Sequence, residues 1–325
     1  MFACTLRLPQ SGSHYPSFPN QGMLPVNPTV FPLTQILAVS TGVSAVLAGM
    51  VSIPYRQAPE KVARIWQKLG ILFLIIFVLV GAGSFGSWAF APVALLLAYS
   101  GWQELLSCLA VKYDDSAENQ TLLIGLGVVG VLGGLADSTA IAIGIVGIAA
   151  WCVLSIPMLI RRQPLHLHYL LGAAFGITFV TAPLAVLLHM AGTSYAAFCF
   201  LVLVVMAHDG LSEGWGLALG KTLLVPEISP SKTWEGALGG AVSSVGIAYI
   251  LKFLLPEWPF LQVAIVAVGI SLLSLTGDLI ASSLKREANI KDFGHILSVT
   301  GGVLDKFDSL FFAAPMFFIV YLSFQ

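Results

Sequence analysis

One stretch without Asp, Glu, Lys or Arg covers 46 residues, from Gln163 to His208. A second such run covers 35 residues, from Leu69 to Gln103. Each run exceeds the ~20 apolar residues that one helix needs to cross a bilayer. Only 10% of the 325 residues are charged, whereas a soluble domain has about 25%. These features predict a polytopic membrane protein and exclude an ordinary soluble enzyme, a nucleic-acid binder with a basic face and an acidic disordered tail.

The apolar runs are continuous rather than alternating, which favours transmembrane helices over a β-barrel. We therefore predict an all-α fold with about ten transmembrane helices. The two long uncharged runs should break at 81–86 and around 191–194. The expected spans are 33–53, 69–86, 88–107, 120–136, 139–160, 169–190, 195–208, 236–255, 260–281 and 309–323.

The chain is expected to have three regions. Residues 1–32 are polar and rich in Pro, Ser and Asn, which predicts a flexible leader, and Met23 is an alternative start. Residues 33–194 hold the first group of transmembrane helices. Residues 195–325 form a C-terminal catalytic region with two charged segments, 209–235 and 282–308, both expected to be loops.

The basic residues give this topology an orientation. With ten spans and an exterior N-terminus, thirteen of the fifteen Lys and Arg residues fall on the cytoplasmic side, and the exceptions are Arg7 and Lys252. This distribution follows the positive-inside rule. Both charged segments are then cytoplasmic, and we expect an integral protein of a bacterial inner (plasma) membrane.

The second charged segment and the helix end before it have the composition of a catalytic site. Five acidic and four basic residues lie within 278–308. Carboxylates suit Mg²⁺, and neighbouring Lys and Arg suit phosphate groups. The glycine pair Gly301-Gly302 allows the backbone to approach a ligand closely. These residues predict magnesium-assisted phosphate transfer at the membrane surface. A solvated connector is the alternative, although it requires the bases and not five acids.

Both charged segments resemble the signature of the phosphatidate cytidylyltransferase (CDP-diacylglycerol synthase) family. In the second segment the matching residues are Ser283, Lys285, Arg286, Lys291, Asp292, Gly301, Gly302, Asp305 and Asp308. In the first segment they run from Ile228 through Ser229, Lys232, Thr233 and Glu235 to Gly236, followed by Gly239-Gly240. A helix start offers a second explanation of the first motif, with Ser231 or Thr233 as the N-cap and Trp234 at the membrane interface.

The resemblance implies that a lipid phosphate attacks the α-phosphorus of CTP, giving CDP-diacylglycerol and pyrophosphate when the lipid is phosphatidate. Asp278 and Asp305 become the first candidates for Mg²⁺ ligands, followed by Asp308 and Asp209. Lys285, Arg286, Lys291, Asp292 and Lys306 are expected to be catalytic. Ser229, Lys232, Thr233, Glu235, Ser283, Gly301 and Gly302 are expected to bind substrate.

The chain departs from the family pattern in the segment that follows Asp209, where the family tends to have an aromatic and basic residues around a Gly, and at two further positions. The family usually has His where this chain has Thr300, and Arg where it has Lys306. Lysine keeps the charge but loses bidentate phosphate geometry. These departures indicate a divergent paralogue and bear more on the substrate than on the fold.

Several alternatives remain open from the sequence. They are a CTP-dependent lipid kinase, a cytidylyltransferase for another lipid phosphate, a catalytically silent paralogue and an ion-coupled transporter. The expected partners are CTP, phosphatidate or a similar lipid phosphate, and membrane lipids; no nucleic acid is expected, and a homodimer is left open. Glu104, at the end of an apolar run, has two interpretations: it faces the bundle interior, or it lies near water at a helix end.

Overall fold

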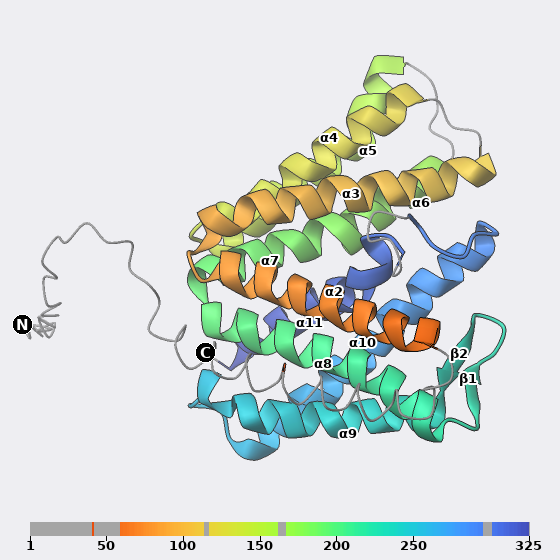
Figure 1. The fold of residues 1–325 in the computed structure, drawn as a ribbon. Helices are drawn as coiled ribbons and strands as arrows, with labels where there is room; N and C mark the ends of the chain where they lie inside the picture. Colours follow the sequence, from red (N-terminus) through yellow and green to blue (C-terminus); the bar gives the residue numbers. More distant parts are fainter. Residues whose placement is uncertain (1–40, 42–58, 114–116, 162–166, 295–300, 325) are drawn as a thin grey trace, which may run out of the picture.

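The computed structural model describes residues 41, 59–113, 117–161, 167–294 and 301–324, and these form a bundle of helices with one small hairpin (Figure 1). The α-helices are α2 (Pro59–Gly83), α3 (Ser87–Tyr113), α4 (Ala117–Val131), α5 (Thr139–Arg161), α6 (Leu167–Gly176), α7 (Ala182–Thr193), α8 (Tyr195–Leu219), α9 (Trp234–Ile250), α10 (Phe260–Glu287) and α11 (Leu304–Ser323). Short 3₁₀ segments extend α4 (Leu132–Leu135) and α9 (Leu251–Leu254), and a π-helical turn (Ile177–Thr181) joins α6 to α7.

The all-α polytopic fold is confirmed. Among the described residues, seven helical stretches are long and apolar enough to cross a membrane: Trp66–Gly83, Thr139–Ile156, Tyr169–Thr193, Tyr195–Leu219, Trp234–Leu254, Phe260–Glu287 and Leu304–Ser323. Thr121–Leu135 is a shorter apolar helix. The expected span 33–53 lies outside the described residues except for Thr41, so the count of ten stays a prediction.

The two predicted breaks in the uncharged runs are confirmed. The turn between α2 and α3 contains Gly86, whose φ of +88° is a conformation that side-chain-bearing residues rarely adopt. The break between α7 and α8 is the single residue Ser194. Outward-facing residues such as Phe77 and Ile143 are apolar and largely exposed, as expected for helices whose solvent is lipid.

Trp102 fixes α3 against its neighbours. Its side chain is fully buried, and its Nε1 donates a hydrogen bond to Thr181 Oγ1 (2.9 Å). A Cβ added at Gly127 of α4 or at Gly176 of α6 would lie 2.2 or 2.3 Å from the indole ring. Glycine at these two positions therefore lets α4 and α6 pack directly on the tryptophan.

The expectation that both charged segments are loops is wrong in part. Helix α8 continues to Leu219, α10 continues to Glu287, and α11 already begins at Leu304. Asp209, Asp305 and Asp308 consequently lie on helices, and the expected spans 195–208 and 309–323 are too short. Charge alone does not end a helix, because the helical backbone satisfies its own hydrogen bonds wherever the side chains are hydrated or paired.

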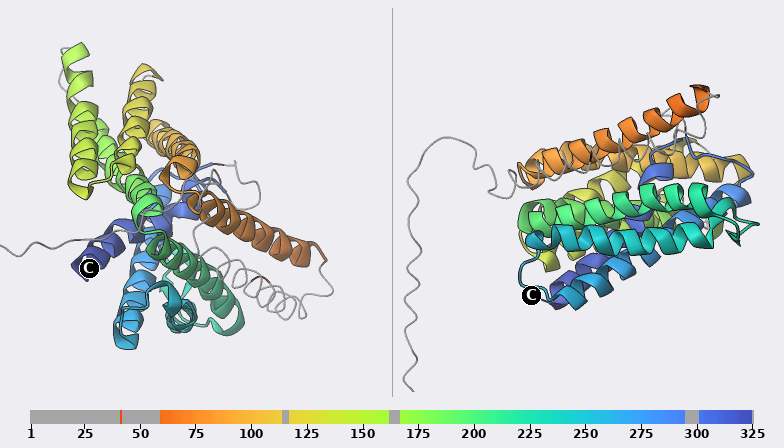
Figure 2. Two further views of the ribbon diagram at one scale, coloured as in Figure 1. Left: turned by 90° about the vertical axis from the view of Figure 1, so that its left-hand side faces the viewer. Right: turned by 60° about the horizontal axis from the view of Figure 1, so that its bottom comes forward.

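The remainder of the first charged segment contains an antiparallel hairpin that the sequence analysis did not predict. Strand β1 (Leu223–Val225) pairs with β2 (Ser229–Thr233). Thr233 then caps α9, because its Oγ1 accepts a hydrogen bond from the Gly236 N–H (3.1 Å). The predicted helix start is thus confirmed with Thr233 as the N-cap, whereas Ser231 belongs to the strand. The hairpin and the C-terminus lie at opposite ends of the bundle (Figure 2).

Candidate active site at one end of the bundle

The two charged segments meet at the bundle end that carries the hairpin. Lys232 of β2 forms an ion pair with Asp278 of α10. Arg286, two turns further along α10, donates from Nε to the backbone carbonyl of Ile228 in the hairpin (3.2 Å). Residues more than forty positions apart in sequence therefore form one polar site, as the family resemblance implied.

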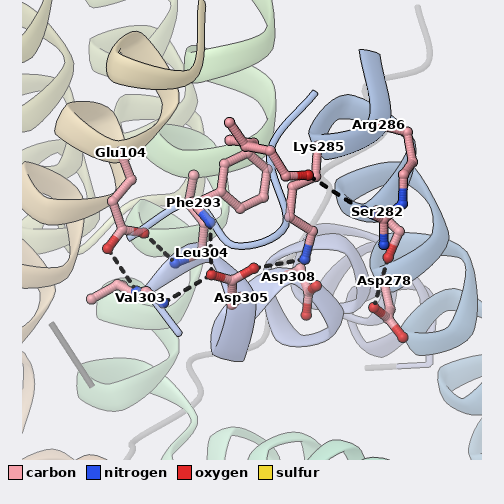
Figure 3. Close-up of polar contacts among 12 residues, drawn as sticks. Glu104, Asp278, Ser282, Lys285, Arg286, Phe293, Val303, Leu304, Asp305 and Asp308 are labelled. Carbon is pink, nitrogen blue, oxygen red and sulfur yellow. Dashed lines mark hydrogen bonds and ion pairs between the residues drawn. The ribbon is translucent and has the colours of Figure 1, made fainter. Parts of the chain in front are cut away.

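A second ion pair joins α10 to α11. Lys285 Nζ lies 2.6 Å from Asp305 Oδ1, and their side chains are only 11% and 5% exposed. The other oxygen of Asp305 accepts hydrogen bonds from the backbone N–H groups of Phe293 (2.9 Å) and Gly302 (2.8 Å) (Figure 3). The Lys285 ammonium also lies 5.3 Å from the centroid of the Phe293 ring. Both oxygens of Asp305 are therefore occupied by donors from this chain.

The other acidic residues of the site differ from Asp305. Asp308, one turn further along α11, is buried, and its Oδ1 accepts from the Ser309 N–H (2.8 Å). Its Oδ2 is buried and has no hydrogen-bond partner among the described residues. The negative charges of Asp278 and Asp209 act on Asp308 through space. The site thus contains three neighbouring carboxylates with one free, buried oxygen.

Lys232 contacts this acidic group through its ion pair with Asp278. Burial would lower the pKa of Lys232, but the carboxylates of Asp278, Asp209 and Asp308 more than offset that effect and leave the pKa raised. The ammonium therefore stays protonated and balances part of the negative charge.

A magnesium ion can be tested against this arrangement. Within the described ranges, no three or more His, Cys, Asp or Glu side chains are grouped closely enough to form a metal site by themselves. Mg²⁺, however, is usually held by one or two carboxylates together with substrate phosphates and water. The free oxygen of Asp308 and the neighbouring Asp278 fit that pattern. Asp305 fits it less well, because a metal would have to displace Lys285 or two backbone donors.

Several predicted substrate-binding residues have structural contacts that explain their presence. Thr233 caps α9, and Glu235 accepts hydrogen bonds from the backbone N–H groups of Lys221 and Thr222. Ser229 is buried in the hairpin. Ser283 is exposed, whereas its neighbour Ser282 donates to Asp278 Oδ1 (3.4 Å). Ser282, and not Ser283, therefore contacts Asp278, and the substrate roles of the other residues stay predictions.

The remaining predicted catalytic residues differ in exposure. Lys291 and Arg286 are exposed, while Asp292 and Lys306 are half-buried. Thr300, one of the positions that depart from the family pattern, lies outside the described residues. Exposed cations next to buried carboxylates are suited to an anionic substrate that arrives from water or from a membrane surface.

Gly301 and Gly302 have no side chain, and this allows the carboxylates of Asp305 and Glu104 to lie directly against the backbone. Gly301 has a φ of +91°, and a Cβ there would lie 2.7 Å from Asp305 Oδ2. A Cβ at Gly302 would lie 2.5 Å from both carboxylate oxygens of Glu104. The close approach expected at this pair is therefore made, in this structure, by Asp305 and Glu104. Glu104 is buried, which settles its two interpretations in favour of the bundle interior.

Fold and site together define a polytopic membrane protein with a charged centre at one end of its helix bundle. A family model described as the cytidylyltransferase family matches residues 62–324. The chain belongs to this cytidylyltransferase family.

Individual relatives agree with the family assignment. The chain is 32% identical over 164 residues to the phosphatidate cytidylyltransferase of Rickettsia prowazekii, covering 47% of this chain and 70% of that protein. It is 37% identical over 128 residues to the phosphatidate cytidylyltransferase of Bacillus subtilis, covering 39% and 47% of the two chains. It is 36% identical over 119 residues to the uncharacterized protein YnbB of Escherichia coli, covering 37% and 40%. The chain thus spans less than half the length of the last two relatives.

Proposed function

We propose that this protein is a phosphatidate cytidylyltransferase, which converts CTP and phosphatidate into CDP-diacylglycerol and pyrophosphate. The observation that carries the proposal is the convergence of Lys232, Asp278, Lys285 and Asp308 at one end of a transmembrane bundle. Relatives named phosphatidate cytidylyltransferase match the chain with 32% and 37% identity. Charged side chains at a membrane-bundle end are costly unless they have a function or a partner.

The proposed reaction requires charge control rather than a strong base. An oxygen of the lipid phosphate forms a bond to the α-phosphorus of CTP, and the bond from that phosphorus to the pyrophosphate oxygen breaks. The phosphate nucleophile is already ionised near neutral pH, so no side chain needs to remove its proton. Arg286, Lys291 and Lys306 would hold phosphate groups, and Lys285 would add positive charge.

We further propose Mg²⁺ as the cofactor, held by Asp308 and Asp278 with Asp209 nearby. When bound, the ion would neutralise phosphate charge and orient the triphosphate. The free Oδ2 of Asp308 supports this assignment. Asp305 remains a predicted ligand, although its hydrogen bonds favour a role in holding the segment that precedes α11.

The proposed location is a bacterial inner membrane with this end of the bundle in the cytoplasm, where CTP is available. The basic residues of both charged segments support that orientation through the positive-inside rule. CTP would then arrive from the aqueous side, and phosphatidate from the adjoining leaflet.

The test is pyrophosphate release from CTP by purified protein in mixed micelles of detergent and phosphatidate with Mg²⁺. Asp278→Asn and Asp308→Asn should each reduce release at least about 100-fold, because each removes charge from the centre. Glu257→Gln is the matched control, since this exposed acid lies in the turn before α10, at the opposite end of the bundle from the hairpin. The control should retain wild-type activity.

Release that persists in both aspartate variants would refute the assignment of the site. CDP in place of pyrophosphate would identify a lipid kinase and refute the proposed reaction. Turnover only with a different lipid phosphate would refute phosphatidate as the substrate. Full folding of each preparation is checked by size-exclusion chromatography before activity is compared.

A further inference from the structure

Glu104 has an unusual position for an acidic residue of a membrane protein. It lies on α3, some 200 residues before the charged segment that it contacts, and only 5% of it is exposed. Its Oε1 accepts a hydrogen bond from the Val303 N–H (2.9 Å), and its Oε2 accepts one from the Leu304 N–H (2.8 Å). Both carboxylate oxygens therefore contact the start of α11 (Figure 3).

These two N–H groups belong to the first turn of a helix, where the backbone donors have no partner within the helix. A side chain at the N-cap position usually satisfies one of them. The N-cap of α11 is Val303, which has no polar side chain and makes no capping bond. Glu104 thus supplies from α3 the cap that α11 lacks. Its negative charge is also favourable at the positive end of the helix dipole.

The surroundings of Glu104 are shaped to hold its carboxylate. A Cβ at Gly294 would lie 2.6 Å from Oε1, and a Cβ at Gly302 would lie 2.5 Å from both oxygens. Trp102, two residues earlier on α3, is wedged between Gly127 and Gly176 on another face of the helix. The packing of Trp102 and the space left by Gly294 and Gly302 therefore hold the Glu104 side chain in place. Its two hydrogen bonds in turn hold the start of α11.

The first turns of α11 carry Asp305, Lys306 and Asp308. Asp305 closes the same turn from inside by accepting from the Gly302 N–H, and it also pairs with Lys285 of α10. Three consecutive residues, Gly302 to Leu304, are thereby held by two carboxylates from different helices, those of Asp305 and Glu104. Asp308 follows on the next turn of the same helix.

We propose that Glu104 is a positioning residue of the active site: it caps α11 from α3 and so places Asp308 and Lys306 for catalysis. The catalytic part of this inference rests on the function proposed above. Its structural part, the capping of α11, can be tested without any activity.

Glu104→Gln is the decisive variant, because the amide retains the size of the side chain but directs an NH₂ group at a backbone N–H. One of the two hydrogen bonds must be lost, and a bond to a charged group is replaced by a neutral one. Gln103→Ala is the matched control, since Gln103 is the adjacent residue of α3 and is exposed. Both variants are compared with the wild-type full chain in detergent.

The first readout is amide hydrogen exchange of the peptide spanning 301–308. Glu104→Gln should exchange there at least about tenfold faster than wild type, in line with the loss of a charge-assisted hydrogen bond. The peptides of α8 and α9 and the Gln103→Ala protein should be unchanged. Equal exchange at 301–308 in wild type and Glu104→Gln overturns the proposal. Faster exchange along the whole chain also overturns it, because Glu104 would then stabilise the fold in general.

The second readout is the Mg²⁺ concentration that gives half-maximal pyrophosphate release. We expect it to rise several-fold in Glu104→Gln, whereas a smaller folded fraction would lower only the maximal rate. An unchanged half-maximal concentration combined with unchanged kcat refutes the catalytic part. If the wild type itself has no activity, the proposed function fails, and the exchange measurement still decides whether Glu104 caps α11.

Discussion

Two ion pairs of equal length allow the effect of burial to be measured directly. Lys285 Nζ and Asp305 Oδ1 are 2.6 Å apart, as are Lys68 Nζ and Glu213 Oε1. The first pair is 11% and 5% exposed, whereas the second is 44% and 53% exposed. We predict that Lys285→Met destabilises the protein far more than Lys68→Met.

The magnitude follows from the dielectric environment. At an effective dielectric constant of about 20, two unit charges 2.6 Å apart attract by about 6 kcal/mol. Desolvation of both groups offsets part of this attraction, but removal of one partner leaves the other charge buried and unpaired, which costs about 3–5 kcal/mol. The exposed Lys68 pair should contribute only about 0–1 kcal/mol. Methionine preserves most of the aliphatic stem in both variants.

The assay is equilibrium unfolding in mixed micelles with increasing SDS, followed by tryptophan fluorescence. A loss for Lys285→Met no larger than that for Lys68→Met would refute the reasoning. A further variant separates unpaired charge from lost packing: Asp305→Asn added to Lys285→Met removes the charge and keeps an oxygen for the Phe293 and Gly302 N–H groups. The double variant should be more stable than Lys285→Met alone.

Three further predictions follow from local contacts. Gly302→Ala should lower the unfolding midpoint, because its Cβ overlaps the Glu104 carboxylate, whereas Gly144→Ala, with open space around it, should not; equal midpoints would contradict this. Thr233→Val should cost about 1 kcal/mol in the same unfolding assay through loss of the α9 cap, and Ser231→Ala should cost less; the reverse order would contradict the cap assignment. Chelation by EDTA should abolish pyrophosphate release and added Mg²⁺ should restore it; release that is indifferent to EDTA would refute the cofactor assignment.

The sequence was sufficient to predict the helical membrane fold, because long uncharged runs have few other solutions. The break at Gly86 was also predictable from the glycines around it. The break at Ser194 was predictable because the uncharged run 163–208 is about twice the length of one transmembrane helix. The ends of α8 and α10 and the start of α11 were not predicted, because these helices continue into the charged segments that were expected to be loops. Asp209 and Asp308 are acidic, but each lies within a helix, because the helical backbone makes its own hydrogen bonds whatever the side chain.

The candidate site was predicted at the level of residue types and only partly at the level of roles. The motif residues Lys232, Asp278, Lys285 and Asp305 do come together, but their pairing could not be inferred from spacing. Asp305 illustrates the difficulty, since its ion pair and two backbone hydrogen bonds depend on helices folded against each other. The local cap by Thr233 was foreseeable because its partner lies only three residues away.

The cap that α3 provides for α11 also has a consequence for the order of assembly. A chain is synthesised from its N-terminus, so Glu104 enters the membrane about 200 residues before the Val303 and Leu304 N–H groups exist. Until then its carboxylate must remain protonated or near the aqueous boundary, because an isolated charge in hydrocarbon is costly. Insertion of α11 therefore completes the centre, and a nascent chain that still lacks α11 has a membrane-embedded bundle without an assembled candidate site.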